Sequence, residues 1–165
     1  MFSVDTYLHA MKENLKMNSE LLVENLQRVC AYNFADEVEL LDFSAFMEPT
    51  RLELSVMMFS MDREANEVFS EDSAGFAGSE EVLPEVTYFQ LDEKHSDEFF
   101  NFYEENEEEI LAQEQNAVAS WFRDCWVKAC GEQVVELPAY FLFHDEFKSL
   151  ELKTNMWIVD NDKWT

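Results

Sequence analysis

The clearest helical pattern in this chain is NAVASWFRDCWVKACG, residues 116–131, and the rest of the predicted fold is built outward from it. Its apolar side chains recur at the spacing of one helix face: Val118, Trp121, Phe122, Cys125, Trp126 and Ala129. Lys128 lies in the last turn, where the helix dipole favours a cation, and Gly131 is a natural C-terminal stop. We therefore expect this helix to bury its apolar face against a sheet, with Trp121 and Trp126 among its anchors.

The helical pattern continues upstream to Ser96 and Asp97, which can cap a helix N-terminus. Acidic residues in the first turn would complement the helix dipole. The whole span is long for a helix of a globular protein, which averages about 10–14 residues. We therefore expect either one long helix or two helices, with a break near Asn106 or near Asn116.

The N-terminal region, residues 3–30, also has helical spacing. Ser3 or Asp5 could cap its start, because both side chains accept hydrogen bonds from free N–H groups of the first turn. Asn18 and Ser19 are poor helix formers and could divide this region into two helices. The prediction is an N-terminal helix or helix pair.

Between the two helical regions, the apolar spacing changes to that of strands. EVELLDFSAF (37–46) and RLELSVMMFSM (51–61) are predicted as two strands joined by a turn at Pro49. The segment 70–81 is rich in Gly, Ser and acids and is predicted as a surface loop. A short strand at 85–91 is expected to follow it.

The C-terminal segments 136–144 and 149–160 are predicted as a closing hairpin, with 145–148 as its turn. The resulting order of elements predicts the α+β class, with a mostly antiparallel sheet. The N-terminal helix or helices and the long acidic-to-apolar helix would pack on one face of the sheet. The length of 165 residues suits a single domain, residues 1–165.

The chain is strongly acidic, with 36 acidic and 11 basic residues and a formal net charge of −25. Phosphates would be repelled by such a chain, which argues against direct binding to nucleic acid, and an anionic membrane surface would repel it as well. Its 15 Phe and four Trp predict a folded core rather than a disordered acidic tail. Repulsion of this size costs stability, so the charge is either an adaptation for solubility or a means of attracting a basic partner.

The remaining composition predicts a cytoplasmic protein. The N-terminal sequence has no basic segment followed by an apolar run, so no signal peptide is predicted, and no stretch is apolar enough to span a membrane. Cys30, Cys125 and Cys130 are odd in number and do not have the spacing of a disulfide framework. We expect them to be buried, reduced thiols.

The acidity is concentrated in DEKHSDEFFNFYEENEEEILAQE, residues 92–114, where ten residues are acidic and Lys94 is the only Lys or Arg. On a continuous helix Glu104 would share a face with Glu107 and Glu108, an arrangement that destabilises an isolated helix. We interpret this stretch as a docking face for Lys and Arg of a partner. Its predicted binding residues are Asp97, Glu98, Glu104, Glu105, Glu107, Glu108 and Glu109.

The sequence contains no persuasive catalytic or metal-binding motif, and we predict neither an enzyme nor a cofactor or metal site. Glycine occurs only at 75, 78 and 131, which excludes the glycine-rich phosphate loops. The run from His144 to Glu146 could contribute to a metal site with ligands from elsewhere, but is typical of a polar hairpin turn. Cys125 and His144 could form a nucleophile pair, but Cys125 lies on the apolar stripe and is expected to be inert.

The C-terminal third resembles small bacterial proteins of uncharacterised or toxin-immunity type, in WFRDCW (121–126) and ELPAYFLFHDEFKSLELKTNMWI (136–158). The resemblance implies a small acidic α+β inhibitor that neutralises a basic toxin, such as a nuclease, by charge-complementary binding. A DNA mimic of the phage anti-restriction or anti-defence type is the alternative, because a glutamate-rich helix can approach the linear charge density of DNA. A small enzyme or metal-binding module without a readable motif is the third hypothesis.

Overall fold

The structure is a computed structural model that describes residues 1–69, 74–131 and 135–165. The helices are α1 (Val4–Met17), α2 (Ser19–Cys30), α3 (Ser96–Glu105) and α4 (Glu107–Cys130), with short 3₁₀ helices η1 (Glu93–His95) and η2 (Asp160–Trp164). The strands are β1 (Leu40–Glu48), β2 (Glu53–Met61), β3 (Ser79–Thr87), β4 (Ala139–Phe143), β5 (Lys148–Glu151) and β6 (Met156–Val159).

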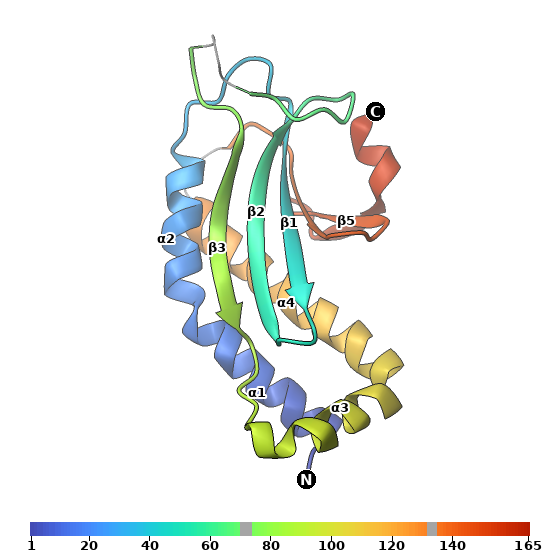
Figure 1. Cartoon of the computed structure of the whole chain (residues 1–165). Helices are drawn as coiled ribbons and strands as arrows, with labels where there is room; N and C mark the ends of the chain where they lie inside the picture. Colours follow the sequence, from blue (N-terminus) through green and yellow to red (C-terminus); the bar gives the residue numbers. More distant parts are fainter. Residues whose placement is uncertain (70–73, 132–134) are drawn as a thin grey trace.

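The six strands form one sheet in the order β3-β2-β1-β4-β5-β6 (Figure 1). All neighbours are antiparallel except β1 and β4, which pair in parallel from Leu41 with Ala139 to Ala45 with Phe143. A parallel pair requires a long connection, and here that connection includes β2, β3, α3 and α4. The predicted α+β class with a mostly antiparallel sheet is confirmed.

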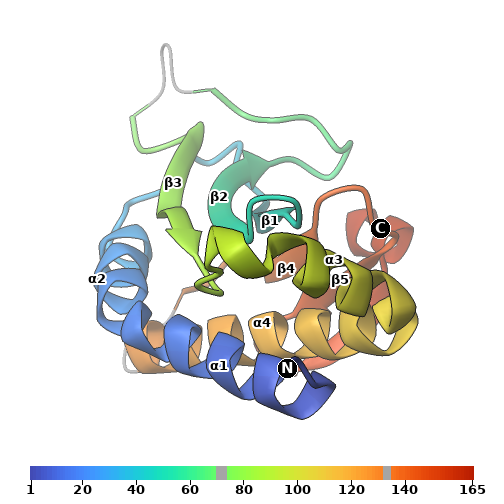
Figure 2. The same cartoon turned by 60° about the horizontal axis from the view of Figure 1, so that its bottom comes forward.

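Helices α1 and α2 follow one another end to end and lie alongside α4, in one layer against one face of the sheet (Figure 1 and Figure 2). Ser3 caps α1, since its side chain accepts from the Thr6 N–H, and Asn18 separates α1 from α2. The expected division of the N-terminal region is therefore confirmed.

The apolar face of α4 packs on the sheet mainly through Phe122 and Trp126. The Phe122 ring stacks on Phe141 at 4.6 Å between centroids, and Trp126 meets Phe43 edge-on at 5.4 Å. The prediction of two tryptophan anchors is correct for Trp126 and wrong for Trp121. The indole of Trp121 is half-buried and donates a hydrogen bond of 2.8 Å to Ser19 Oγ, so it joins α4 to α2 instead.

Strand β3 begins earlier and ends earlier than the predicted strand at 85–91. It runs from Ser79 to Thr87, so the predicted loop at 70–81 already becomes a strand at its last three residues. Residues 70–73 of that loop lie outside the described residues. Pro84 is accommodated because β3 is an edge strand and its pairing with β2 shifts register on either side of Val56.

The predicted closing hairpin is correct in its first half. Leu142 pairs with Ser149 and Tyr140 with Glu151, as expected for an antiparallel hairpin at the end of the sheet. The segment 149–160 is not one strand, however. It turns again at Asn155, which has a left-handed backbone (φ 61°), and forms β6 next to β5.

The long acidic-to-apolar helix is broken at Asn106 and continues through Asn116. Ser96 and Asp97 are not its caps, because both already lie within α3. Asp92 caps the preceding η1, since its side chain accepts from the Lys94 N–H, and α3 follows from His95 without a side-chain cap bond. The helical region therefore begins upstream of the expected caps Ser96 and Asp97, with the 3₁₀ turn η1 at Glu93–His95.

Cys30 and Cys130 form a disulfide that joins the C-terminal ends of α2 and α4, with 6.0 Å between their Cα atoms. The expectation of three reduced thiols is therefore wrong for this pair, while Cys125 is free and buried. Disulfides persist mainly in oxidising environments, so this bond removes the cysteine argument for a cytoplasmic location. Among the described residues, no helix is long and apolar enough to cross a bilayer.

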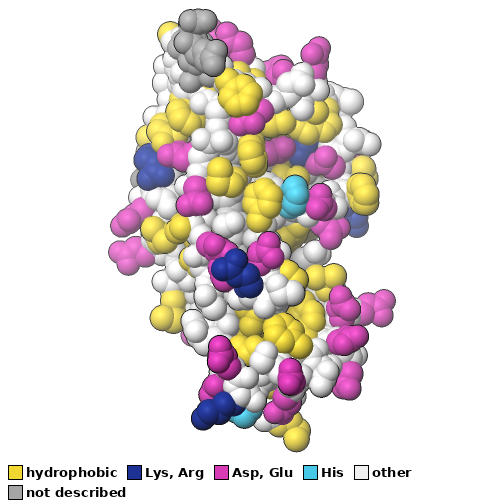
Figure 3. Space-filling view, in the orientation of Figure 1, with side chains coloured by type: hydrophobic (Ala, Val, Ile, Leu, Met, Phe, Trp, Pro, Cys, Tyr) yellow, Lys and Arg dark blue, Asp and Glu magenta, His cyan; other side chains and the backbone are white. Residues whose placement is uncertain are grey.

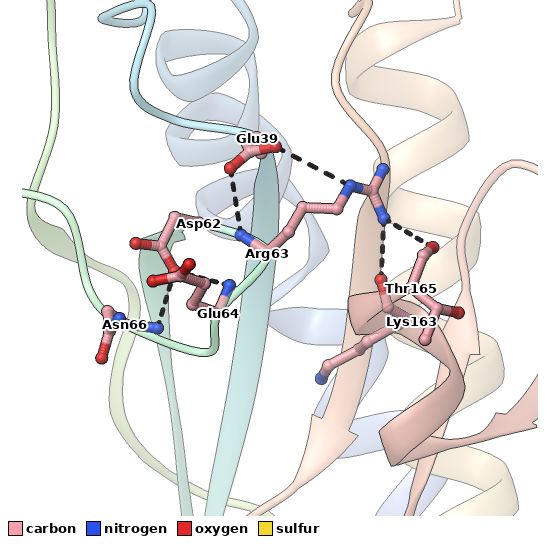
Figure 4. A network of polar contacts seen from close by, with 7 residues as sticks. All are labelled: Glu39, Asp62, Arg63, Glu64, Asn66, Lys163 and Thr165. Carbon is pink, nitrogen blue, oxygen red and sulfur yellow. Dashed lines mark hydrogen bonds and ion pairs between the residues drawn. The ribbon is translucent and has the colours of Figure 1, made fainter.

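A buried lysine fixes the C-terminal helix η2 to the sheet. Lys163 Nζ lies 2.6 Å from Asp160 Oδ1 and 3.0 Å from Asp42 Oδ1, and it donates a hydrogen bond of 3.0 Å to Ser149 Oγ. Arg63, in the turn after β2, adds a hydrogen bond of 2.9 Å to the Lys163 carbonyl (Figure 4). The C-terminus is thereby held against the sheet by charge-assisted bonds.

Candidate functional site

The seven carboxylates predicted to bind a partner all occupy exposed positions at one end of the molecule. They lie in the first turn of α3 (Asp97, Glu98), at its end (Glu104, Glu105) and in the first turn of α4 (Glu107, Glu108, Glu109). Asp and Glu side chains gather over this end, at the lower right of Figure 3. We call these seven residues the acidic face.

The acidic face has no lysine or arginine counter-ion among the described residues. Its one ion pair there joins Glu98 to His95, with 3.6 Å between Oε2 and Nδ1, and both side chains are more than half exposed. Elsewhere, acids such as Glu80 and Glu53 pair with Arg28 and Arg51. The acidic face therefore presents negative charge that the described chain leaves uncompensated.

Asn106 divides the acidic face into two groups. Its backbone (φ −119°, ψ 15°) leaves the helical region, and its N–H bonds the carbonyls of Phe102 and Tyr103. The next helix starts at once, because the Asn106 carbonyl accepts the Ile110 N–H. The alignment expected for Glu104 with Glu107 and Glu108 on a continuous helix is therefore wrong.

The first turn of α4 also borders a cavity of about 410 Å³, which lies between α4 and the ends of β1 and β4. Its acidic and tyrosine residues are Glu48, Glu107, Glu114, Asp145, Glu146, Tyr88 and Tyr103. Its apolar wall includes Phe46, Leu111 and Phe143, and among the described residues no lysine or arginine lines it. The cavity therefore offers acceptors for a polar, positively charged head group and an apolar wall for a methylene stem, the two parts of an amphipathic side chain.

Glu114 is the buried carboxylate of this cavity, with 1% of its surface exposed. It accepts hydrogen bonds from the hydroxyls of Tyr7, on α1, and Tyr103, on α3, the latter at 2.7 Å. Burial raises the pKa of Glu114, and the two tyrosine hydroxyls oppose that rise. Because a carboxylate offers about four lone-pair directions, two of them stay free for a further donor.

Tyr88 lines the same cavity and is 1% exposed. The residue is positioned just after β3 by its backbone, which donates to the Leu52 carbonyl at 2.9 Å and accepts from Asn14 Nδ2 at 3.2 Å. Its buried hydroxyl has no hydrogen-bond partner in the described part of the chain. Burial raises the pKa of Tyr88, and the charge of Glu114 adds to the rise.

The residues from His144 to Glu146 lie at the rim of the cavity, in the tight turn between β4 and β5. Asp145 has a left-handed backbone (φ 69°), and the His144 ring packs on Phe46 at 4.6 Å between centroids. The expected hairpin turn is confirmed. Within the described residues, no group of three or more His, Cys, Asp or Glu side chains could hold a metal ion.

Cys125 and His144 do not meet. Cys125 is buried on α4 and lines a separate hollow with Ser19 and Trp121, whereas His144 is exposed at the rim of the acidic cavity. Burial raises the pKa of the Cys125 thiol, as expected for an inert cysteine.

Of the acidic face, only Glu107 also lines the cavity, and sequence reasoning missed the cavity's other acceptors. Glu114 did carry a signal. It lies four residues after Ile110 and four before Val118, so it occupies the apolar stripe of α4. A carboxylate at such a position is rarely buried without partners, which marks it as a candidate. No sequence pattern marks Tyr88 as a cavity residue, because its position at the cavity depends on how β3 pairs in the sheet.

Comparison with known protein families, curated proteins and solved structures finds no match to this chain. The resemblance of residues 121–126 and 136–158 to toxin-immunity proteins therefore stays a prediction.

Proposed function

We propose that this protein binds a basic protein through the acidic face and acts as an inhibitor of the toxin-immunity type. The observation that carries the proposal is the acidic face itself: seven exposed carboxylates at one end, with no lysine or arginine counter-ion among the described residues. Uncompensated charge of one sign attracts a partner of the opposite sign and repels phosphates, which favours a protein partner over nucleic acid.

The acidic face would act chiefly on the rate of association. Electrostatic steering raises association rates from about 10⁵–10⁶ M⁻¹s⁻¹ toward about 10⁸–10⁹ M⁻¹s⁻¹ at low salt. An inhibitor that must reach a basic toxin before the toxin reaches its substrate benefits from such a rate. If the toxin is a nuclease, the bound acidic face would cover the basic surface that holds its nucleic acid.

A DNA mimic is less well supported. Imitation of a DNA backbone requires a row of regularly spaced charges along one axis. Asn106 ends α3 and divides the carboxylates between two helices, which interrupts such a row.

The test compares two variants that change the net charge equally. One carries Gln at the five glutamates of the acidic face: Glu104, Glu105, Glu107, Glu108 and Glu109. The matched control neutralises five exposed acids elsewhere, on and after the N-terminal helices: Glu13, Glu20, Glu24, Asp36 and Glu37. Association rates are measured by surface plasmon resonance against a panel of basic nuclease toxins, together with inhibition of their nuclease activity.

We expect the five-glutamate variant to associate at least about tenfold more slowly than the wild type, and the control variant to lose much less. Raising salt from about 0.05 M to about 0.5 M should slow the wild type steeply, because it shortens the Debye length. Binding by none of the panel, or equal loss in both variants with no response to salt, would show that the acidity serves solubility alone.

A further inference from the structure

The acidic cavity differs from the acidic face in having buried acceptors. The acidic face is exposed throughout, and its carboxylates are hydrated. Glu114 and Tyr88, by contrast, are each 1% exposed and lie where water is largely excluded. A cation that reaches them would exchange its hydration for fixed acceptors in a medium of low dielectric, where each bond is stronger than at the surface.

The unpartnered hydroxyl of Tyr88 points to a ligand that the described chain does not supply. A buried polar group without a partner is destabilising, so it usually has one, from protein, water or ligand. Tyr7 and Tyr103 donate their hydrogens to Glu114, while the hydroxyl of Tyr88 bonds no described residue. Tyr88 and Glu114 both line the cavity and keep free lone pairs, which a donor group reaches once the side chains that cover them move aside.

The remaining walls suit a long side chain with a planar, positively charged end. Glu107, Asp145 and Glu146 stand at the exposed rim, while Leu111 and Phe143 provide apolar surface for a methylene stem. A guanidinium has five N–H donors and no acceptor. This matches a cavity that carboxylates and tyrosines line and that no lysine or arginine of the described chain lines. A volume of about 410 Å³ accommodates one such side chain.

We propose that this cavity receives one arginine side chain of the basic partner, with Glu114 and Tyr88 as the buried acceptors of its guanidinium. The proposal rests on the proposed function and adds an anchoring position to it. The acidic face steers the partner by long-range attraction, and the cavity holds it by short, desolvated bonds. Buried anchors of this kind contribute most of the binding energy of an interface and affect mainly the dissociation rate.

The first test uses N-acetylarginine amide as a probe and N-acetylcitrulline amide as its neutral isostere. Each is titrated into the ¹⁵N-labelled protein and followed by NMR. We expect the arginine derivative to bind in the millimolar range and to shift amides of residues 45–48, 88 and 143–146. The citrulline derivative should bind at least about tenfold more weakly. Equal binding of the two, or shifts confined to α3, would overturn the proposal.

Tyr88→Phe isolates the hydroxyl. It removes a group with no hydrogen-bond partner in the described structure, so the variant should be as stable as the wild type or more stable. Its affinity for the arginine derivative should nevertheless fall by roughly three- to tenfold, since a desolvated acceptor is lost. Unchanged affinity in a folded Tyr88→Phe variant would contradict the assignment.

Two double variants distinguish binding in the cavity from general electrostatic attraction by the negative charge of the protein. Glu107→Gln with Glu146→Gln neutralises two of the three rim carboxylates, whereas Glu105→Gln with Glu109→Gln changes the charge equally at positions that do not line the cavity. The rim variant should lose roughly five- to tenfold in affinity for the probe, and the other variant less than about twofold. Equal losses would reject the cavity while leaving the acidic face as a steering surface. The proposed function fails separately, if basic toxins associate at the same rate with and without the five glutamates.

Discussion

Glu114 shows how one buried carboxylate can join three helices. Its carboxylate joins α4 to Tyr7 of α1 and Tyr103 of α3, so it fixes the position of α3 against the helical layer. The cost is the burial of an ionisable group, which raises its pKa. A leucine at this position would fill the stripe of α4 without that cost, but would leave both tyrosine hydroxyls without an acceptor.

The raised pKa of Glu114 predicts how stability depends on pH. The folded protein favours the protonated form more than the unfolded chain does, so this contribution is complete below the ordinary pKa of 4.5 and is lost as pH rises through the folded value. Glu114→Gln mimics the protonated form. Its stability relative to wild type should therefore increase with pH above about 4.5. Urea unfolding of both proteins between about pH 4 and about pH 8 measures this difference.

The exposed Glu109→Gln provides the control for that experiment, because it changes the same residue type on the same helix. Its difference from wild type should vary much less with pH. If the curves of Glu114→Gln and wild type run parallel throughout, the burial of Glu114 does not govern its ionisation.

Lys163 is the second residue whose burial creates a prediction. Its side chain is 1% exposed and is compensated by Asp42, which is also buried, and by Asp160. Lys163→Met would leave Asp42 as a buried charge without its partner and should cost about 3–5 kcal/mol of unfolding free energy. The double variant with Asp42→Asn removes both charges and should recover part of that loss. Chemical denaturation of the two variants tests this, and equal stability of the single and double variants would contradict it.

At the scale of elements, α2 and α4 depend on each other. Their C-terminal ends are joined by the disulfide between Cys30 and Cys130, which closes a loop with a sequence separation of 100. Constraint of so long a loop in the unfolded chain predicts a stabilisation of about 4.7 kcal/mol at most. The variant with Ser at both positions should lose a large part of this, measured by denaturant unfolding under oxidising conditions.

A reductant provides the matching control. It should lower the stability of the wild type toward that of the double serine variant and leave that variant unchanged. A wild type that is equally stable with and without reductant would show that the bond is not formed in solution.

The sequence predicted the elements wherever one periodicity dominated. The stripe of α4, the alternation in β2 and the break at Asn18 were all readable from local spacing. The predicted strand start at 85 was wrong because a proline normally interrupts a strand. Pro84 lies within β3 only because β3 is an edge strand with a shifted register. The turn at Asn155 was missed because residues 149–160 keep a strand-like pattern on both sides of it.

The candidate site could be predicted only in part, because its residues are brought together by topology. Acidic composition identified Glu107 and its neighbours directly. The cavity combines the ends of β1 and β4 with α4, and these meet only because β1 and β4 pair in parallel across a long connection. No local pattern indicates that pairing. The disulfide was missed for the same reason, since Cys30 and Cys130 are distant in sequence.

At the scale of the whole molecule, the charge of −25 is unevenly distributed and acts against folding. Basic residues compensate parts of the sheet, as Arg51 does for Glu53 and Glu85. The helix dipole helps at the first turn of α4, where Glu107 to Glu109 lie at the positive end, but opposes Glu104 and Glu105 at the end of α3. The acidic face is therefore the region where self-repulsion should be strongest.

This distribution predicts how the stability of the free protein responds to salt. Raising sodium chloride from about 0.05 M to about 0.5 M shortens the Debye length and screens repulsion between exposed carboxylates. The thermal midpoint of the wild type should therefore rise. The variant with Gln at the five glutamates of the acidic face should begin with a higher midpoint at low salt and gain less from added salt. The control variant, with five acids neutralised around α1 and α2, should keep most of the wild-type response, because it retains the crowded charges of α3 and α4.

Sodium chloride is preferred to a sulfate salt in this experiment, since sulfate strengthens apolar burial by itself and would raise every thermal midpoint. Differential scanning calorimetry of the three proteins at both salt concentrations gives the comparison. Equal salt responses of the three proteins would mean that electrostatic repulsion is spread over the whole surface. The acidic face would then have no excess repulsion for a basic partner to relieve.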